Sequence, residues 1–130
     1  MAQNYLLIYS EQLATDIELL CQNIKTSSNT VFQLRKSSSS IYANIREANY
    51  GQSKADMLSK FEISLKECNE TEGWLQILFN TRFIDEITFK KHRNLCGRIR
   101  RMLIASCKTL KENINTAKEN MKRRKHLMNK

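Results

Sequence analysis

The chain has 130 residues, a formal net charge of +9, no proline and three glycines. This length allows one domain with a hydrophobic core, and the scarcity of helix breakers favours long helices. No apolar run approaches the roughly 20 residues that a membrane span requires, and the N-terminal residues lack a signal-peptide pattern. We therefore expect a cytoplasmic protein that is not inserted in a membrane.

Two helices are predicted in the first part of the chain. The first covers about residues 6–25, because apolar residues recur there at helical spacing. Thr30 and Gln33 form a candidate capping box for the second helix, and Gly51 is expected to end it. The serine run at residues 37–40 lies inside this helix and predicts close helix packing, with hydroxyls bonded back to backbone carbonyls.

Two longer helices are predicted in the rest of the chain. Ser53 and Asp56 are expected to open the third, over about residues 53–80, and Asp85 to cap the fourth, over about residues 86–126. Short connections between four amphipathic helices predict an all-α, antiparallel up-down-up-down four-helix bundle with a long basic fourth helix. We assign residues 1–116 to the bundle and 117–130 to a basic C-terminal extension, which either overhangs the bundle or frays.

The positive charge is concentrated in the predicted fourth helix. Residues 90–130 contain 14 Lys and Arg against two Glu, whereas residues 1–89 contain 8 Lys and Arg against 11 Asp and Glu. At about 100° per residue, one outer sector of this helix is basic. We name this set the basic column: Lys90, Arg93, Arg100, Arg101, Lys108, Lys111, Lys118 and Lys122, continued by Arg123 and Arg124.

A column of this kind predicts binding to the phosphate backbone of a nucleic acid. No helix-turn-helix, zinc finger or RNA-binding sheet motif is visible in the sequence, so sequence-specific reading is not predicted. The alternative interpretation is a solvated helix face that keeps the protein soluble.

A set of apolar residues falls on the outer side of the predicted third helix. Relative to Cys68 at the centre of the core face, Ile63, Trp74 and Ile77 project to the opposite side, with Gly73 beside them. These residues predict a subunit interface, and the alternative is ordinary scattered surface exposure.

Three polar residues are expected on core faces, namely Asn44, Glu72 and His92. Reflecting the chain about the turn near Arg82 places positions 72 and 92 at the same height. We therefore expect Glu72 to hydrogen-bond His92, or to pair with Arg35 or Arg93 instead. A polar clasp that fixes the helix register is favoured over a catalytic pair, and Asn44 is expected to be a satisfied buried amide.

Nothing in the sequence calls for an enzyme, a metal or a cofactor. Four dispersed cysteines without a C-x-x-C pair predict reduced, buried thiols: Cys21, Cys68, Cys96 and Cys107. The Glu-x-x-His pairs of di-iron bundles are missing, because Phe89 and Arg123 stand three residues before the two histidines. There is no glycine-rich phosphate loop and no G-x-S-x-G motif, so we predict a non-catalytic protein.

A specific pattern covers residues 37–75. It reads S-S-x-S-I-x-A-N-I-x-E-A, then S-K-x-D, then L-K-E-x-N-E-T-x-x-W-L, and begins at Ser37 and ends at Leu75. The pattern resembles the four-helix bundle proteins encoded by intervening sequences in bacterial large-subunit rRNA genes. The resemblance implies a homo-oligomer, pentameric in several members. Gly73 departs from the aromatic residue that is common in relatives at this position.

A related branch, the accessory variability determinants of diversity-generating retroelements, partners a reverse transcriptase and its template RNA. The chain looks more like the intervening-sequence branch, because the S-I-x-A-N-I-x-E-A and N-E-T-x-x-W-L motifs are intact. We expect a homo-oligomer that binds nucleic acid, RNA or a ribonucleoprotein, through its fourth helix. The alternative is a scaffold or adaptor for an acidic protein partner, such as a reverse transcriptase complex, without nucleic-acid affinity of its own.

Overall fold

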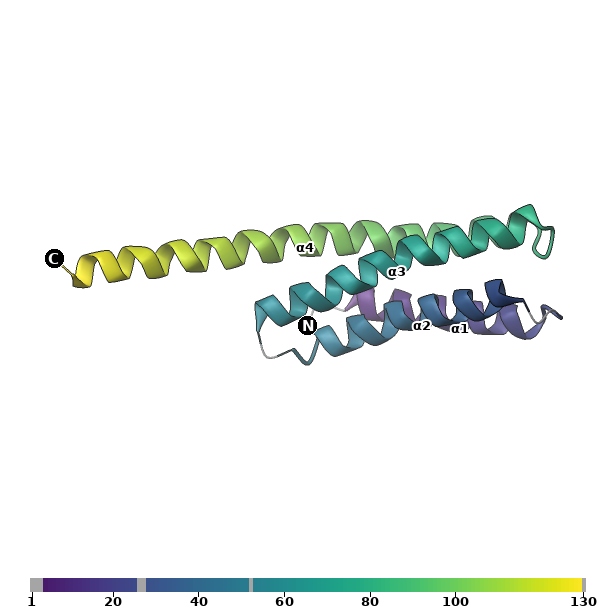
Figure 1. Cartoon of the computed structure of the whole chain (residues 1–130), viewed down its shortest axis with the longest axis horizontal. Helices are drawn as coiled ribbons and strands as arrows, with labels where there is room; N and C mark the ends of the chain where they lie inside the picture. Colours follow the sequence, from purple (N-terminus) through teal and green to yellow (C-terminus); the bar gives the residue numbers. More distant parts are fainter. Residues whose placement is uncertain (1–3, 26–27, 52, 130) are drawn as a thin grey trace.

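The computed structural model describes residues 4–25, 28–51 and 53–129. The helices in these ranges are α1 (Tyr5–Gln22), α2 (Asn29–Ala48), α3 (Lys54–Asn80) and α4 (Glu86–Met128). The ribbon reverses direction between successive helices (Figure 1). The prediction of an all-α four-helix bundle is confirmed, and none of the helices in these ranges is long and apolar enough to cross a membrane.

One hydrophobic core holds the four helices together. α1 packs against α2 and α4, and α3 packs against the same two helices from the other side. The core contains aliphatic side chains from every helix, together with all four cysteines, which are buried as predicted. Fully buried members include Leu13, Ile17, Leu34, Ile41, Ile45, Leu75, Leu78, Ile99 and Leu103. Burial of this apolar surface is the main stabilising contribution to the fold.

The predicted starts of the two long helices are confirmed. The Ser53 hydroxyl accepts a hydrogen bond from the Asp56 N–H at 3.1 Å, and the Asp85 carboxylate accepts one from the Thr88 N–H at 2.7 Å. Each cap satisfies a backbone donor that the first helical turn leaves without a partner. The hydrogen bonds from Thr88 also hold the pKa of the Asp85 carboxyl below its usual value.

The predicted ends of α2 are wrong at both termini. Ser28 caps the helix by accepting from the Val31 N–H at 3.4 Å, so Thr30 lies inside the first turn. Both residues offer a hydroxyl at a helix start, and the sequence pattern does not distinguish them. The helix stops at Ala48, so Gly51 lies in the connection and does not form the helix end.

A non-glycine residue closes the turn between α3 and α4. Arg82 has a φ of 65°, in the left-handed region that normally favours glycine. The Phe83 N–H donates to the Leu78 carbonyl at 2.9 Å, and the Arg82 N–H donates to the Phe79 carbonyl at 3.0 Å. These two bonds form a Schellman motif, in which the left-handed position is occupied by Arg82.

Small hydroxyl side chains join α2 to α3. The buried Thr71 hydroxyl donates to the Ser37 hydroxyl at 2.8 Å, and Ser37 in turn donates to the Leu34 carbonyl at 3.2 Å. Ser64 donates across the same seam to the Ile41 carbonyl at 3.0 Å. The prediction that the serine run bonds back to carbonyls is confirmed, and a hydroxyl that reaches a neighbouring backbone requires close helix packing.

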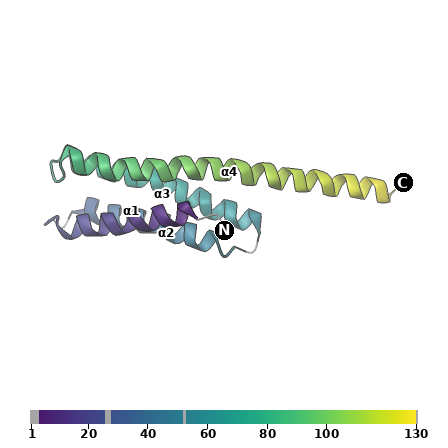
Figure 2. The ribbon, with the colours of Figure 1, turned by 180° about the vertical axis from the view of Figure 1, so that it is seen from behind.

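α4 is much longer than the helices that it packs against. It has 43 residues and α3 has 27, about 64 Å against about 40 Å at 1.5 Å per residue. Leu110 is the last buried residue, and Ile114 is the only half-buried one in the described segment after it. The two opposite views in Figures 1 and 2 both show the C-terminal part of α4 projecting past the rest of the bundle. The extension is therefore an overhanging helix that continues to Met128.

Candidate nucleic-acid interface

The basic column lies along one uninterrupted helix. Nine of its ten members are exposed, and Arg100 is half-buried. From Lys90 to Lys122 the column extends for about 48 Å at 1.5 Å per residue. It begins beside the bundle and continues along the projecting part of α4, so it presents cations over a distance much longer than a single phosphate contact.

Intramolecular partners occupy some of these cations. Lys90 pairs with Glu86 at 2.8 Å, which lowers the pKa of the Glu86 carboxyl. The Arg93 guanidinium lies 4.9 Å from the centre of the Phe89 ring. In the described ranges no carboxylate forms an ion pair with the cations of the middle and end of the column: Arg101, Lys108, Lys111, Lys118 and Lys122. These side chains can bind an external anion without first breaking an internal salt bridge.

Each predicted partner of Glu72 is wrong. Glu72 pairs with Arg100, whose Nε lies 3.3 Å from the carboxylate oxygen. The buried His92 instead places its Nδ1 at 2.7 Å from the Thr88 carbonyl of its own helix. Arg35 is taken by Glu18 of α1 at 3.0 Å. The prediction considered the height of each residue along the bundle and ignored the direction in which long helical side chains extend.

Asn44 is half-buried, and its Nδ2 donates to the Ser40 carbonyl of the preceding turn at 2.9 Å. Its amide is thus satisfied within α2 as predicted, although it is less deeply buried than expected. Of the three predicted polar residues, Glu72 is therefore the one whose described hydrogen bond joins two helices, from Arg100 of α4 to α3.

The residues of the predicted outer apolar set of α3 differ in their exposure. Ile63 and Ile77 are each 41% exposed, and Gly73 is exposed beside them. Trp74 does not project away from the bundle, because its half-buried side chain packs against the core. The prediction that Trp74 projects away from the core is wrong, because the core face of α3 was considered alone, whereas α2 lies beside this flank of the helix.

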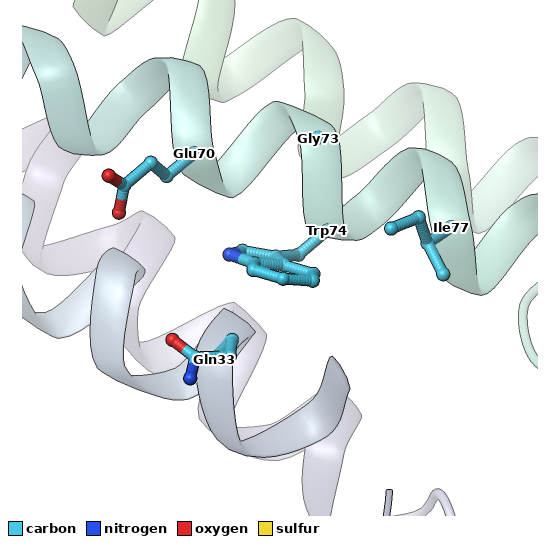
Figure 3. A pocket seen from close by; sticks show the side chains of 5 residues that line it. All are labelled: Gln33, Glu70, Gly73, Trp74 and Ile77. Atoms are coloured by element: carbon cyan, nitrogen blue, oxygen red, sulfur yellow. The ribbon is translucent and has the colours of Figure 1, made fainter. Parts of the chain in front are cut away.

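Trp74 lines a shallow pocket between α2 and α3. Figure 3 shows the ring extending from α3 over Gln33 of α2, with Glu70 on one side and Ile77 on the other. The pocket has a volume of about 460 Å³. Burial and the negative charge of Glu70 raise the pKa of the carboxyl of nearby Glu67. This surface is apolar and acidic, unlike the basic column of α4.

The described residues offer no metal site of the usual kind, since no three His, Cys, Asp or Glu side chains among them are grouped to hold an ion. Burial raises the pKa of the Cys21 and Cys107 thiols, which disfavours the reactive thiolate. Cys96 donates to the Cys68 carbonyl at 3.5 Å inside the core. Their placement is that of packing residues.

Comparison with known proteins agrees with this architecture. The model of the family described as 23S rRNA-intervening sequence protein matches residues 6–105, from α1 into α4. The chain is similar to a crystal structure from Bacteroides thetaiotaomicron VPI-5482, of a protein of unknown function from the S23 ribosomal protein family. The two are 36% identical with a TM-score of 0.76, over 79% of this chain and 98% of that chain. No curated protein matches the chain. The chain therefore belongs to the 23S rRNA-intervening sequence protein family.

Proposed function

We propose that this protein is a non-catalytic, homo-oligomeric helical bundle that binds nucleic acid, either RNA or a ribonucleoprotein, through the basic column of α4. The observation that carries the proposal is the alignment of cations, nine of ten of them exposed, along one sector of a helix that projects past the bundle. Lys90 and Arg100 form ion pairs, and the other cations of the column have no carboxylate partner in the described ranges. A row of cations on a straight helix matches the repeated negative charge of a phosphate backbone.

The charge distribution supports a polyanion as the partner. The first 89 residues contain more acidic than basic residues, so the excess positive charge belongs to α4 and not to the surface as a whole. A solubilising surface needs no such segregation, and mixed charges serve that purpose as well. A single-sign face also accelerates encounter with a polyanion by electrostatic steering. The family description connects relatives with 23S rRNA genes, and we extend that association to RNA as the bound polymer.

Self-association would strengthen weak contacts of this type. Ile63 and Ile77 are exposed on α3 and supply apolar surface for an interface between copies. Several basic columns in one assembly would bind the same polymer together, so that modest individual contacts combine into high avidity.

The experiment that tests the proposal is purification at low salt followed by size-exclusion chromatography with light scattering and absorbance at 260 and 280 nm. We expect an oligomer that carries RNA, with the 260 nm absorbance lost after ribonuclease treatment. A protein that purifies without nucleic acid and binds no added RNA would overturn the proposal. An adaptor for an acidic protein would then be the better explanation of the same basic face.

A further inference from the structure

A small polar pocket lies between α3 and α4. It has a volume of about 230 Å³ and lies over Gly97, in the N-terminal third of α4. Its lining consists of Glu72 from α3 and Arg93, Asn94, Gly97, Arg100 and Arg101 from α4. Three arginines and one glutamate thus line the pocket, so its lining has an excess of positive charge.

Gly97 creates the space that these groups share. A Cβ atom at this position would lie 3.3 Å from Nη1 of Arg101, 3.6 Å from Oε1 of Glu72 and 3.7 Å from Nη2 of Arg100. The terminal nitrogens of two arginines therefore converge over a helix surface that has no side chain. Glycine is unfavourable in the middle of a helix, so its presence here requires a local reason such as this close approach.

Two of the three guanidinium groups are oriented by other side chains before any ligand arrives. Glu72 holds Arg100 through Nε, which leaves the two terminal nitrogens of that arginine available. Arg93 lies over the Phe89 ring, and Phe89 stacks on Phe79 with ring centres 4.7 Å apart. An arginine that is already oriented loses less conformational freedom when it binds an anion.

We propose that this pocket, which we call the Gly97 pocket, binds one phosphate group. Planar guanidinium groups donate pairs of parallel hydrogen bonds that match phosphate oxygens. The identification of that phosphate as part of a nucleic acid backbone rests on the proposed function, since Arg93, Arg100 and Arg101 of the basic column line the pocket. A phosphorylated small molecule has the same chemistry and is the other possible source.

The test is a calorimetric titration of the full chain with inorganic pyrophosphate and, separately, with a short RNA hairpin. Arg101→Gln removes one exposed guanidinium from the pocket and should weaken both ligands by about tenfold, the value of one charge-assisted hydrogen bond. The double variant Lys25→Gln with Lys54→Gln, on exposed lysines outside α4, is the charge control and should bind pyrophosphate as the wild type does.

Gly97→Ala separates loss of the pocket from loss of the fold. Alanine should raise the urea midpoint, because it favours the helix more than glycine does and the flexible Arg101 side chain can move away. The same substitution should weaken pyrophosphate binding severalfold, since the new methyl group displaces that guanidinium. Weaker binding by a more stable protein cannot be explained by unfolding.

Each outcome separates this inference from the proposed function. Pyrophosphate binding that depends on Arg101, without RNA binding, would support the pocket, assign it to a small phosphorylated ligand and overturn the proposed function. RNA binding that is unaffected by Arg101→Gln and Gly97→Ala, with no heat from pyrophosphate, would overturn the pocket and leave the proposed function in place. Absence of both kinds of binding would overturn both.

Discussion

Arg100 on α4 reaches Glu72 on α3 although His92 is the residue that lies level with Glu72. The contact between the Cys96 thiol and the Cys68 carbonyl shows which residues of α3 and α4 lie at the same height along the bundle. Counted from this contact toward the turn, four residues along each helix lead to Glu72 and His92. Side chains of an α-helix extend toward the N-terminus of their own helix. Because the helices are antiparallel, Glu72 and Arg100 extend toward each other and meet between their own levels, at 3.3 Å.

The left-handed residue in the α3–α4 turn predicts a stabilising substitution. Arg82→Gly should raise the free energy of unfolding by about 0.5–1 kcal/mol, because glycine has no Cβ penalty in this conformation and part of the gain is offset by entropy in the unfolded chain. Urea unfolding measures the change. Arg82→Ala is the matched control, because it removes the charge and keeps the Cβ atom. Equal stabilisation by both substitutions would show that charge, and not backbone conformation, is responsible.

The hydroxyl pair between α2 and α3 should behave as a coupled unit. Ser37→Ala leaves the buried Thr71 hydroxyl without its partner and should destabilise the protein by about 1–3 kcal/mol. The double variant with Thr71→Val should be less destabilised than the sum of the single variants, since no hydroxyl is then left unpaired. A double-mutant cycle by urea unfolding measures this coupling. Strict additivity would mean that the bond contributes nothing beyond the packing of the two side chains.

The environment of Glu67 predicts a pH-dependent contribution to stability. Burial and then the charge of Glu70 raise the pKa of Glu67 above its ordinary 4.5, so its ionised form is less favourable in the folded state than in the unfolded state. This penalty is present at neutral pH and disappears as the pH falls through the raised pKa. Glu67→Gln should therefore raise the unfolding temperature at pH 7 and lose this advantage in acid. Glu119→Gln, on the exposed projecting helix, is the control, and an equal gain there would indicate a general charge effect.

The exposed isoleucines of α3 are expected to form contacts between copies of the chain. Ile63→Glu together with Ile77→Glu should lower the mass measured by light scattering and leave the far-ultraviolet circular dichroism unchanged, because neither side chain belongs to the buried core. Trp74 is less suitable for this test, since its truncation would also remove core packing. Ile87→Glu is the matched control on α4, where the native side chain is 81% exposed. An unchanged mass in the α3 variant would exclude this surface as the interface.

The fold was predictable because strong local signals agree with one another. The apolar periodicity and the scarcity of breakers predict four helices, the caps at Ser53 and Asp85 predict the starts of two of them, and the structure contains all four. The start of α2 was placed too late, since Ser28 and Thr30 carry equivalent capping groups. The left-handed conformation of Arg82 has no signal in the sequence, because glycine or asparagine would be expected there.

The candidate site was predictable only where a single helix determines it. The phase of the basic column follows from α4 alone, and the exposed positions of Lys108 and Lys111 agree with it. The surroundings of Trp74 and the partner of Glu72 depend on how neighbouring helices pack, and periodicity within one helix does not report this. A glycine between arginines was the available signal for the Gly97 pocket, and its meaning requires the carboxylate that α3 places beside it.

The measurement that tests nucleic-acid binding by α4 most directly is the affinity for an RNA hairpin across a range of salt concentrations. The wild type is compared with a triple variant, Lys108→Gln, Lys111→Gln and Lys118→Gln, and with a control triple outside α4, Lys25→Gln, Lys54→Gln and Lys66→Gln. We predict that the logarithm of the affinity falls linearly with the logarithm of the salt concentration, and that the α4 variant reduces the slope by roughly one per phosphate contact removed. Binding through the basic column would be contradicted if the α4 variant kept the affinity and the slope of the wild type. It would also be contradicted if the control triple lost as much affinity and slope as the α4 variant.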